Sequence, residues 1–180
     1  GRVHADNTDS YGFLRNLRER VPDWRANAGP ALVIGAGGAA RAAIYSLVSE
    51  GAPAVHVVNR SKDRAETLRH VFGNRVSVER KSDVPKLLKE VSIVVNATSL
   101  GMKGMPHLPF PHNALRPETV VTDLVYTPIE TELLRRAAIK GCKVADGLGM
   151  LLHQAAASFD AWYGIRPKIN PTLRSLALAG

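Results

Sequence analysis

The sequence predicts an α/β protein with a Rossmann-like, doubly wound parallel sheet of about six strands. Two observations point to this fold class. Short runs of β-branched residues alternate with segments of helical composition along the chain, which is the pattern of successive βαβ units. The first apolar run also leads directly into a glycine-rich turn and a helix, an order typical of dinucleotide-binding sheets.

Six apolar runs are interpreted as strands. The fourth of them, SIVVNA, is apolar on nearly every residue, as expected for a strand that helices cover on both faces. We expect strands at residues 31–34, 54–58, 75–79, 92–97, 119–125 and 142–146.

The segments between these strands are predicted to be helices. Gly51 and Gly73 end two of them, because glycine is favoured just after a helix C-terminus. The stretch 101–117 is rich in Gly, Pro and Met, and we interpret it as a surface connection rather than a functional lid. We expect helices between strands at residues 38–50, 62–72, 83–90 and 129–140.

Helices are also predicted at both ends of the chain, at residues 7–20, 148–162 and 171–178. We expect them to lie outside the six-stranded core and to pack on a part of the protein that this chain does not contain. The predicted division is a dinucleotide-binding domain over residues 1–149, with 7–20 as an interdomain helix. Residues 150–180 then form terminal helices that belong to a second domain, absent from this chain.

The composition excludes several classes of protein. With 45% hydrophobic and 22% charged residues, the chain is typical of a globular domain rather than a disordered or fibrous one. No apolar run approaches the length of a membrane span, and no signal segment opens the chain. The single cysteine, Cys142, cannot form an internal disulfide, and no Cys/His spacing suggests a metal site. We expect a cytoplasmic protein without a metal.

The net charge of +8 indicates an anionic partner. The basic residues are scattered along the chain, and aromatic residues make up only 6% of it, so no platform for stacked bases stands out. We therefore expect a small-molecule anion, with neither nucleic acid nor a membrane as a partner.

The string GAGGAA at residues 35–40 is interpreted as a phosphate-binding turn. Gly35 permits the tight turn, Gly37 lets the backbone approach a pyrophosphate, and Ala40 lets the helix pack closely on the strand. The N–H groups at the start of the helix then face the phosphates. An ordinary glycine turn is the alternative. The predicted cofactor-binding residues of the turn are Gly35, Ala36, Gly37, Gly38 and Ala39.

The residues after the second predicted strand indicate NADP rather than NAD. NAD enzymes usually carry an acidic residue there, which accepts hydrogen bonds from the ribose 2′-OH, but Asn59 occupies the position in this chain. Arg60, Ser61 and Arg64 follow and can donate charge-assisted hydrogen bonds to a 2′-phosphate. The alternative is a pair of solvated arginines at the start of a helix.

Four further strings occur in order along the chain: NTDSYG at 7–12, NATSLGM at 96–102, DLVYTPIETELL at 123–134 and GLGMLLHQAAASFDAW at 147–162. Together with the two strings described above, they resemble the shikimate dehydrogenase family over essentially the whole chain. The resemblance implies an oxidoreductase that reduces 3-dehydroshikimate to shikimate with NADPH, on the route to chorismate and the aromatic amino acids.

The resemblance also implies roles for individual residues. Asp9 would pair with a catalytic lysine and bind a substrate hydroxyl, while Tyr126 and Gln154 would contact the substrate. From the residues alone, a helix cap remains open for Asp9, packing for Tyr126 and a solvated position for Gln154. The residues implied at the cofactor are Thr98, the backbone of Leu124, and Gly147, for which a turn remains open.

In this family the catalytic lysine and a serine-bearing substrate motif lie in an N-terminal domain that precedes the N-T-D string. We therefore expect the chain to be a fragment that binds the cofactor but catalyses poorly or not at all. Two other hypotheses stay open, a quinate/shikimate dehydrogenase that uses NAD and a non-catalytic NADP-binding module. An acidic residue in place of Asn59 would favour the first, and the missing lysine favours the second. We expect a monomer or a homodimer.

Overall fold

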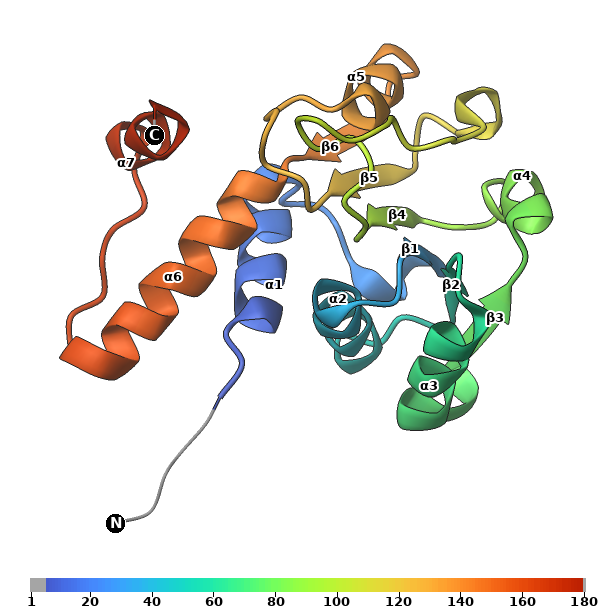
Figure 1. The fold of residues 1–180 in the computed structure, drawn as a ribbon, viewed down its shortest axis with the longest axis horizontal. Helices are drawn as coiled ribbons and strands as arrows, with labels where there is room; N and C mark the ends of the chain where they lie inside the picture. Colours follow the sequence, from blue (N-terminus) through green and yellow to red (C-terminus); the bar gives the residue numbers. More distant parts are fainter. Residues whose placement is uncertain (1–5, 180) are drawn as a thin grey trace.

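A computed structural model describes residues 6–179 as an α/β fold around one six-stranded sheet (Figure 1). The strand order is β3-β2-β1-β4-β5-β6, and every neighbouring pair is parallel. The predicted fold class is confirmed, and the strands are shorter than predicted by a residue or two at some ends. They are β1 (Ala31–Ile34), β2 (Val55–Val58), β3 (Val76–Glu79), β4 (Ile93–Asn96), β5 (Val120–Asp123) and β6 (Lys143–Ala145).

Helices connect successive strands, as expected for a doubly wound sheet, except between β4 and β5, where a loop with one short 3₁₀ turn makes the connection. The α-helices are α1 (Asp9–Arg20), α2 (Gly38–Ser49), α3 (Lys62–Phe72), α4 (Val84–Leu87), α5 (Glu132–Ile139), α6 (Gly147–Tyr163) and α7 (Pro171–Ala179). Short 3₁₀ turns also occur: η1 (Ala26–Ala28), η2 (Gly73–Arg75), η3 (Lys81–Asp83) and η4 (His112–Ala114).

Two predicted helices are shorter than expected, for local reasons. After Leu87 the backbone tightens, so that the N–H of Lys89 bonds to the carbonyl of Lys86 at 3.1 Å instead of continuing the α-helix. Helix α5 begins only after Thr131, whose hydroxyl accepts a hydrogen bond from the N–H of Leu134 at 3.3 Å and caps the helix.

Alternate residues of the strands point into two separate cores. Ala31 and Val33 of β1 pack in the core that contains side chains of α1, α2 and α3, whereas Leu32 packs in the core beneath α4 and α5. Helices therefore cover both faces of the sheet, as Figure 1 shows. This explains why the two central strands, β1 and β4, are almost uninterruptedly apolar.

Helix α1 and the first turns of α6 belong to the core of the sheet, so the expectation that the end helices lie outside it is wrong for these segments. Phe13 and Leu17 of α1 are fully buried in the same core as Met150 of α6. Figure 1 shows α6 running beside α1 and then away from the sheet, after which the chain turns back to α7.

Glycines allow α1 and α6 to approach each other closely. A Cβ atom at Gly12 would lie 2.5 Å from the carbonyl oxygen of Met150, and one at Gly149 would overlap Oδ1 of Asn16. The division of the chain between residues 149 and 150 stays a prediction. Residues 1–5 and 180 of the predicted ranges lie outside the described part of the chain.

Asp146 joins three of the helices near the end of β6. Its carboxylate caps α6 by accepting the N–H of Leu148 at 3.1 Å, and it pairs with Arg20 of α1 at 2.6 Å and with Arg174 of α7 at 3.0 Å. Burial opposes ionisation of this carboxyl group, but the hydrogen bonds and charges of the two arginines outweigh that effect and lower its pKa. The ionised form of Asp146 therefore stabilises the packing of α1, α6 and α7.

We expect Asp146→Asn to lower the free energy of unfolding at pH 7 by about 1.5–3 kcal/mol, because the amide cannot replace two charge-assisted bonds. A group whose folded-state pKa is lowered stabilises the protein above its ordinary value of 3.8 and loses that effect as the pH falls toward the folded-state pKa. Urea denaturation of the wild type and of Asp146→Asn should therefore show a difference in the free energy of unfolding. We expect this difference to be constant above about pH 5 and to shrink below about pH 4.

The matched control is Asp23→Asn at the exposed pair with Lys143, where the loss should stay below about 1 kcal/mol. A difference between wild type and Asp146→Asn that grows as the pH falls would contradict the assignment of the ionised form.

Candidate functional site

The carboxyl ends of the central strands bring most of the predicted cofactor-binding residues to one edge of the sheet. The strand order reverses direction at β1 and β4, and ligands of such sheets bind at that switch point. Backbone hydrogen bonds fix the loops there: the N–H of Ala97 donates to the carbonyl of Ile34 at 2.8 Å, and the N–H of Leu124 donates to that of Asn96 at 2.9 Å.

The glycine turn after β1 combines one closely packed position with two open ones. Gly35 has φ +118°, and a Cβ atom there would lie 2.7 Å from the carbonyl oxygen of Ala97, so only glycine fits. Around Gly37 and Gly38 no heavy atom lies within 4 Å of an added Cβ. No side chain caps the start of α2, so this open space lies where backbone N–H groups can bind a phosphate. The turn fits the predicted pyrophosphate.

The predicted 2′-phosphate residues lie at the end of β2 and the start of α3. The amide of Asn59 donates to the carbonyl of Ser61 at 2.8 Å and closes the turn, while the hydroxyl of Ser61 makes no cap bond to the helix. Arg60 and Arg64 are exposed and form no ion pair with any residue in the range 6–179, whereas Arg69 on the same helix pairs with Glu66. Both predicted arginines are therefore available to an anion.

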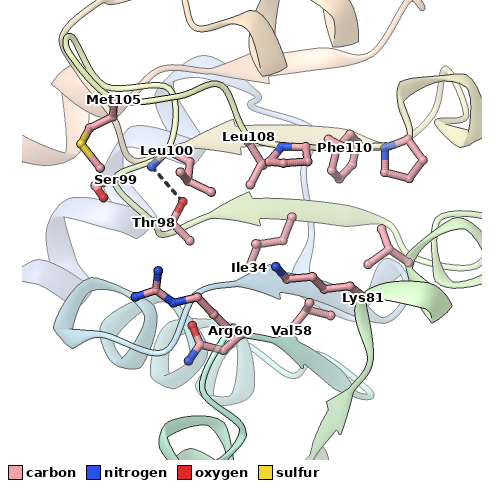
Figure 2. A pocket seen from close by; sticks show the side chains of 14 residues that line it. Ile34, Val58, Arg60, Lys81, Thr98, Ser99, Leu100, Met105, Leu108 and Phe110 are labelled. Atoms are coloured by element: carbon pink, nitrogen blue, oxygen red, sulfur yellow. Dashed lines mark hydrogen bonds between the residues drawn. The ribbon is translucent and has the colours of Figure 1, made fainter.

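A cavity of about 360 Å³ adjoins this cluster (Figure 2). Its only charged lining residues are Arg60 and Lys81, on the side of β2 and β3, and Leu108 and Phe110 face them from the loop after β4. The interpretation of 101–117 as a plain surface connection is therefore wrong for the part that forms this wall. The lining residues are Ile34, Val58, Asn59, Arg60, Lys81, Val84, Thr98, Ser99, Leu100, Met105, Leu108, Pro109, Phe110 and Pro111.

A buried carboxylate links the ends of β4 and β5. Asp123 is completely buried and accepts hydrogen bonds from Asn96 Nδ2 at 2.9 Å, the N–H of Val125 at 3.0 Å and Thr131 Oγ1 at 2.7 Å. Burial raises the pKa of Asp123, and the three hydrogen bonds offset only part of that effect. This side chain fixes the loop after β5 to the last residue of β4.

Asn96 in turn holds the loop that contains Thr98. Its Oδ1 accepts the N–H and the hydroxyl of Thr98 at 3.1 and 2.8 Å, and its Nδ2 also donates to the carbonyl of Leu100 at 3.1 Å. The hydroxyl of Thr98 accepts the N–H of Leu100 at 3.1 Å, the bond drawn in Figure 2. Thr98 lines the cavity, but its hydroxyl is engaged in shaping the loop.

The predicted pair Leu124 and Gly147 lies in direct backbone contact. A Cβ atom at Gly147 would overlap the carbonyl of Leu124, and the N–H of Gly147 donates to the carbonyl of Val125 at 3.3 Å. Only glycine therefore fits at the start of α6. Tyr126 comes next along the same loop, is 40% exposed and makes no hydrogen bond with any residue that the structure describes.

Asp9 and Gln154 lie on the facing helices α1 and α6. A Cβ atom at Gly12, one turn after Asp9, would lie 3.0 Å from Cβ of Gln154, and Thr8 Oγ1 lies 3.0 Å from Ser158 Oγ. Thr8 occupies the cap position of α1, so the helix-cap role considered for Asp9 is not found. Within residues 6–179, no cation pairs with the Asp9 carboxylate.

The described residues offer neither a metal site nor a membrane-spanning helix. Over the described residues, no group of three or more His, Cys, Asp and Glu side chains could hold a metal ion. None of the helices in that part of the chain has the length and apolar character needed to cross a membrane.

Comparison with known proteins agrees with this geometry. The family model described as shikimate/quinate 5-dehydrogenase matches residues 18–103, and the one described as the shikimate 5′-dehydrogenase C-terminal domain matches residues 147–176. Proteins named shikimate dehydrogenase (NADP(+)) from Jannaschia sp. and Paracoccus denitrificans are 51% and 52% identical over 179 residues, 99% of this chain. The chain belongs to the shikimate dehydrogenase family. It spans 64% of the length of these relatives.

Solved structures of the family share the fold. Quinate dehydrogenase from Corynebacterium glutamicum in complex with NAD gives a TM-score of 0.89 at 33% identity, over 97% of this chain and 63% of that one. Shikimate 5-dehydrogenase from Thermus thermophilus in complex with NADP(H) and shikimate gives a TM-score of 0.77 at 39% identity. This match covers 90% of this chain and 58% of that one.

Sequence reasoning missed three residues of the site. Asn96 and Asp123 stand in the strings that carry the family resemblance, and a polar residue ending an otherwise apolar strand was the available signal for both. Lys81 stands two positions after the end of the third strand, as Arg60 does after the second, and that equivalence was its only signal.

The glycine turn makes a prediction about two substitutions with opposite effects. Gly37→Val should lower the free energy of unfolding by less than about 1 kcal/mol, since the side chain meets open space, yet weaken NADPH binding roughly tenfold or more by filling the space above α2. Gly35→Ala is the structural control and should lose about 2–4 kcal/mol of stability. Urea denaturation and fluorescence titration measure both effects, and unchanged NADPH affinity in Gly37→Val would contradict the assignment of the turn.

The raised pKa of Asp123 makes a prediction about pH. A buried acid with a raised pKa binds its proton more tightly in the folded state, so its ionisation lowers stability as the pH rises from 3.8 to the folded-state pKa. Asp123→Asn keeps the shape and does not titrate. We expect the stability of the wild type relative to Asp123→Asn to fall over that range and then level off, as measured by urea denaturation between about pH 4 and pH 7. If the stability of the wild type relative to Asp123→Asn increases as the pH rises, the prediction is contradicted.

Proposed function

We propose that the chain is the NADP-binding part of a shikimate dehydrogenase, which reduces 3-dehydroshikimate to shikimate with NADPH for the biosynthesis of chorismate and the aromatic amino acids. One observation carries the proposal. The open glycine turn and two arginines that form no ion pair with a described residue, Arg60 and Arg64, follow neighbouring strands at one edge of the sheet. Membership of the family supports the chemistry, and the two relatives are named as NADP(+) enzymes.

The residues present fit NADP. The N–H groups of the turn at residues 35–39 would bind the pyrophosphate, and Asn59, Arg60, Ser61 and Arg64 would bind the 2′-phosphate. Bound NADPH would supply the hydride for the reduction. Leu124 and Gly147 would line the nicotinamide, where their backbones touch.

Reduction of a ketone leaves negative charge on its oxygen, which needs a nearby proton donor. We propose that Asp9 binds a substrate hydroxyl and orients the lysine that the family carries in its N-terminal domain. Gln154, on the helix that faces Asp9, and the exposed Tyr126 would contact the substrate. These roles rest on the family resemblance together with the placement of the three side chains.

Two alternatives make different predictions. A quinate/shikimate dehydrogenase that uses NAD is supported by the fold match to the Corynebacterium enzyme, but Asn59 stands where such a cofactor favours an acid. A non-catalytic NADP-binding module would bind NADPH without turnover. Absorbance assays with 3-dehydroshikimate and 3-dehydroquinate distinguish them when the chain is joined to an N-terminal domain that carries the lysine. Turnover mainly with the second ketone and NADH supports the first alternative, and no turnover with either ketone supports the second.

We further propose a cytoplasmic protein that is a monomer or a homodimer. The free thiol of Cys142, buried and not part of a disulfide, suits a reducing compartment. Sedimentation at micromolar concentration would distinguish the two assemblies.

The cofactor proposal predicts that the chain binds NADPH about 100-fold more tightly than NADH, as two charge-assisted bonds allow. Arg60→Ala should weaken NADPH binding roughly tenfold and NADH binding less than about threefold, measured by cofactor fluorescence. The matched control is Arg69→Ala, which removes the same charge from α3 outside the cluster. An equal loss for both cofactors in Arg60→Ala would show that the 2′-phosphate lies elsewhere.

A further inference from the structure

Lys81 leaves β3 at the level at which Arg60 leaves β2. The two strands are parallel neighbours with Val58 in register with Glu79, and each basic residue stands two positions beyond that pair. Lys81 begins the 3₁₀ turn η3 and lines the same cavity as Arg60, and Figure 2 shows both basic side chains on the strand side of the cavity. The register of the sheet therefore brings two cations to the same side of this cavity.

The ammonium group of Lys81 has no counter-charge in the described part of the chain. Oε1 of the neighbouring acid Glu79 lies 3.0 Å from Nδ1 of His56, so this carboxylate is engaged on the sheet. Asp83, the next acid along the chain, accepts the backbone N–H of Arg80 at 3.2 Å and caps η3. Lys81 itself forms no ion pair within residues 6–179.

The rest of the cavity is neutral and mostly apolar, with Ile34, Val58, Leu108 and Phe110 in its walls. Two positive charges at an apolar cavity favour a ligand with an apolar ring and an anionic group. In a dinucleotide bound at the turn after β1, the adenosine lies beyond the end of β2, and its ribose carries the 2′-phosphate there.

We propose that Lys81 is a third cation for the 2′-phosphate of NADP and a residue that determines cofactor specificity. The inference rests on the proposed function and deepens it. Arg60 offers a planar fork to the phosphate oxygens, whereas Lys81 adds a compact charge from the neighbouring strand. The apolar cavity that the two cations line would hold the adenine.

The test uses ligands that report on the adenosine end alone. 2′,5′-ADP carries the 2′-phosphate and 5′-AMP does not, so their affinities for the 180-residue chain can be compared by isothermal titration without any turnover. Lys81→Gln should weaken the binding of 2′,5′-ADP and NADPH roughly five- to tenfold. The same substitution should weaken the binding of 5′-AMP and NADH less than about twofold. Lys81→Arg should retain the wild-type preference.

The matched control is Lys86→Gln, which removes the same charge from an exposed residue of α4 that does not line the cavity. If the wild type prefers 2′,5′-ADP and Lys81→Gln behaves as Lys86→Gln does, the role of Lys81 is overturned and the proposed function stands. If the wild type shows no preference between 2′,5′-ADP and 5′-AMP, the proposed NADP site is overturned together with Lys81.

Discussion

The hydrogen bonds that Asp123 accepts determine the shape of the candidate site. Parallel strands bring their carboxyl ends to one edge, but they do not by themselves fix the loops that follow. Asn96 and Asp123, the last residues of β4 and β5, do so by bonding to each other and to the loops that contain Thr98 and Tyr126. A carboxylate that is fully buried is tolerated only while its acceptor positions are satisfied, so the two loops are held in one arrangement or the network is lost as a whole.

The glycines divide into two groups that the residue type alone does not distinguish. Gly35, Gly147 and Gly149 lie where another part of the chain would collide with a side chain, so they maintain the packing of the turn and of α6. Gly37 lies where a Cβ atom would meet nothing, so its lack of a side chain leaves room for a ligand. A string such as GAGGAA therefore combines a structural requirement and a binding requirement, and only the surroundings of each residue show which applies.

Periodicity and local motifs were sufficient to predict the sheet, because buried parallel strands must be apolar and glycine turns have few local alternatives. Features that depend on tertiary packing were not predicted. The burial of Phe13 in α1 depends on the approach of α6, and these two helices are far apart along the chain. Asn16 of α1, for example, donates a hydrogen bond to the carbonyl of Asp146, which lies 130 residues later. The wall formed by Leu108 and Phe110 depends on a loop without regular structure folding back over the sheet, and no periodic pattern predicts such a path.

The two ends of the candidate site differ in the charges that the described residues supply. At the edge beside β2 and β3, Arg60, Arg64 and Lys81 provide positive charge, and none of them forms an ion pair with a described acid. At the other end, Asp9 lies on α1, one turn before the residue that packs against Gln154 of α6, and no described cation pairs with Asp9. The proposed dinucleotide binding would use the first set of groups, whereas protonating a reduced ketone would need a cation beside Asp9. On that proposal, cofactor affinity and turnover are separable properties, and the charged edge beside β2 can be studied through binding alone.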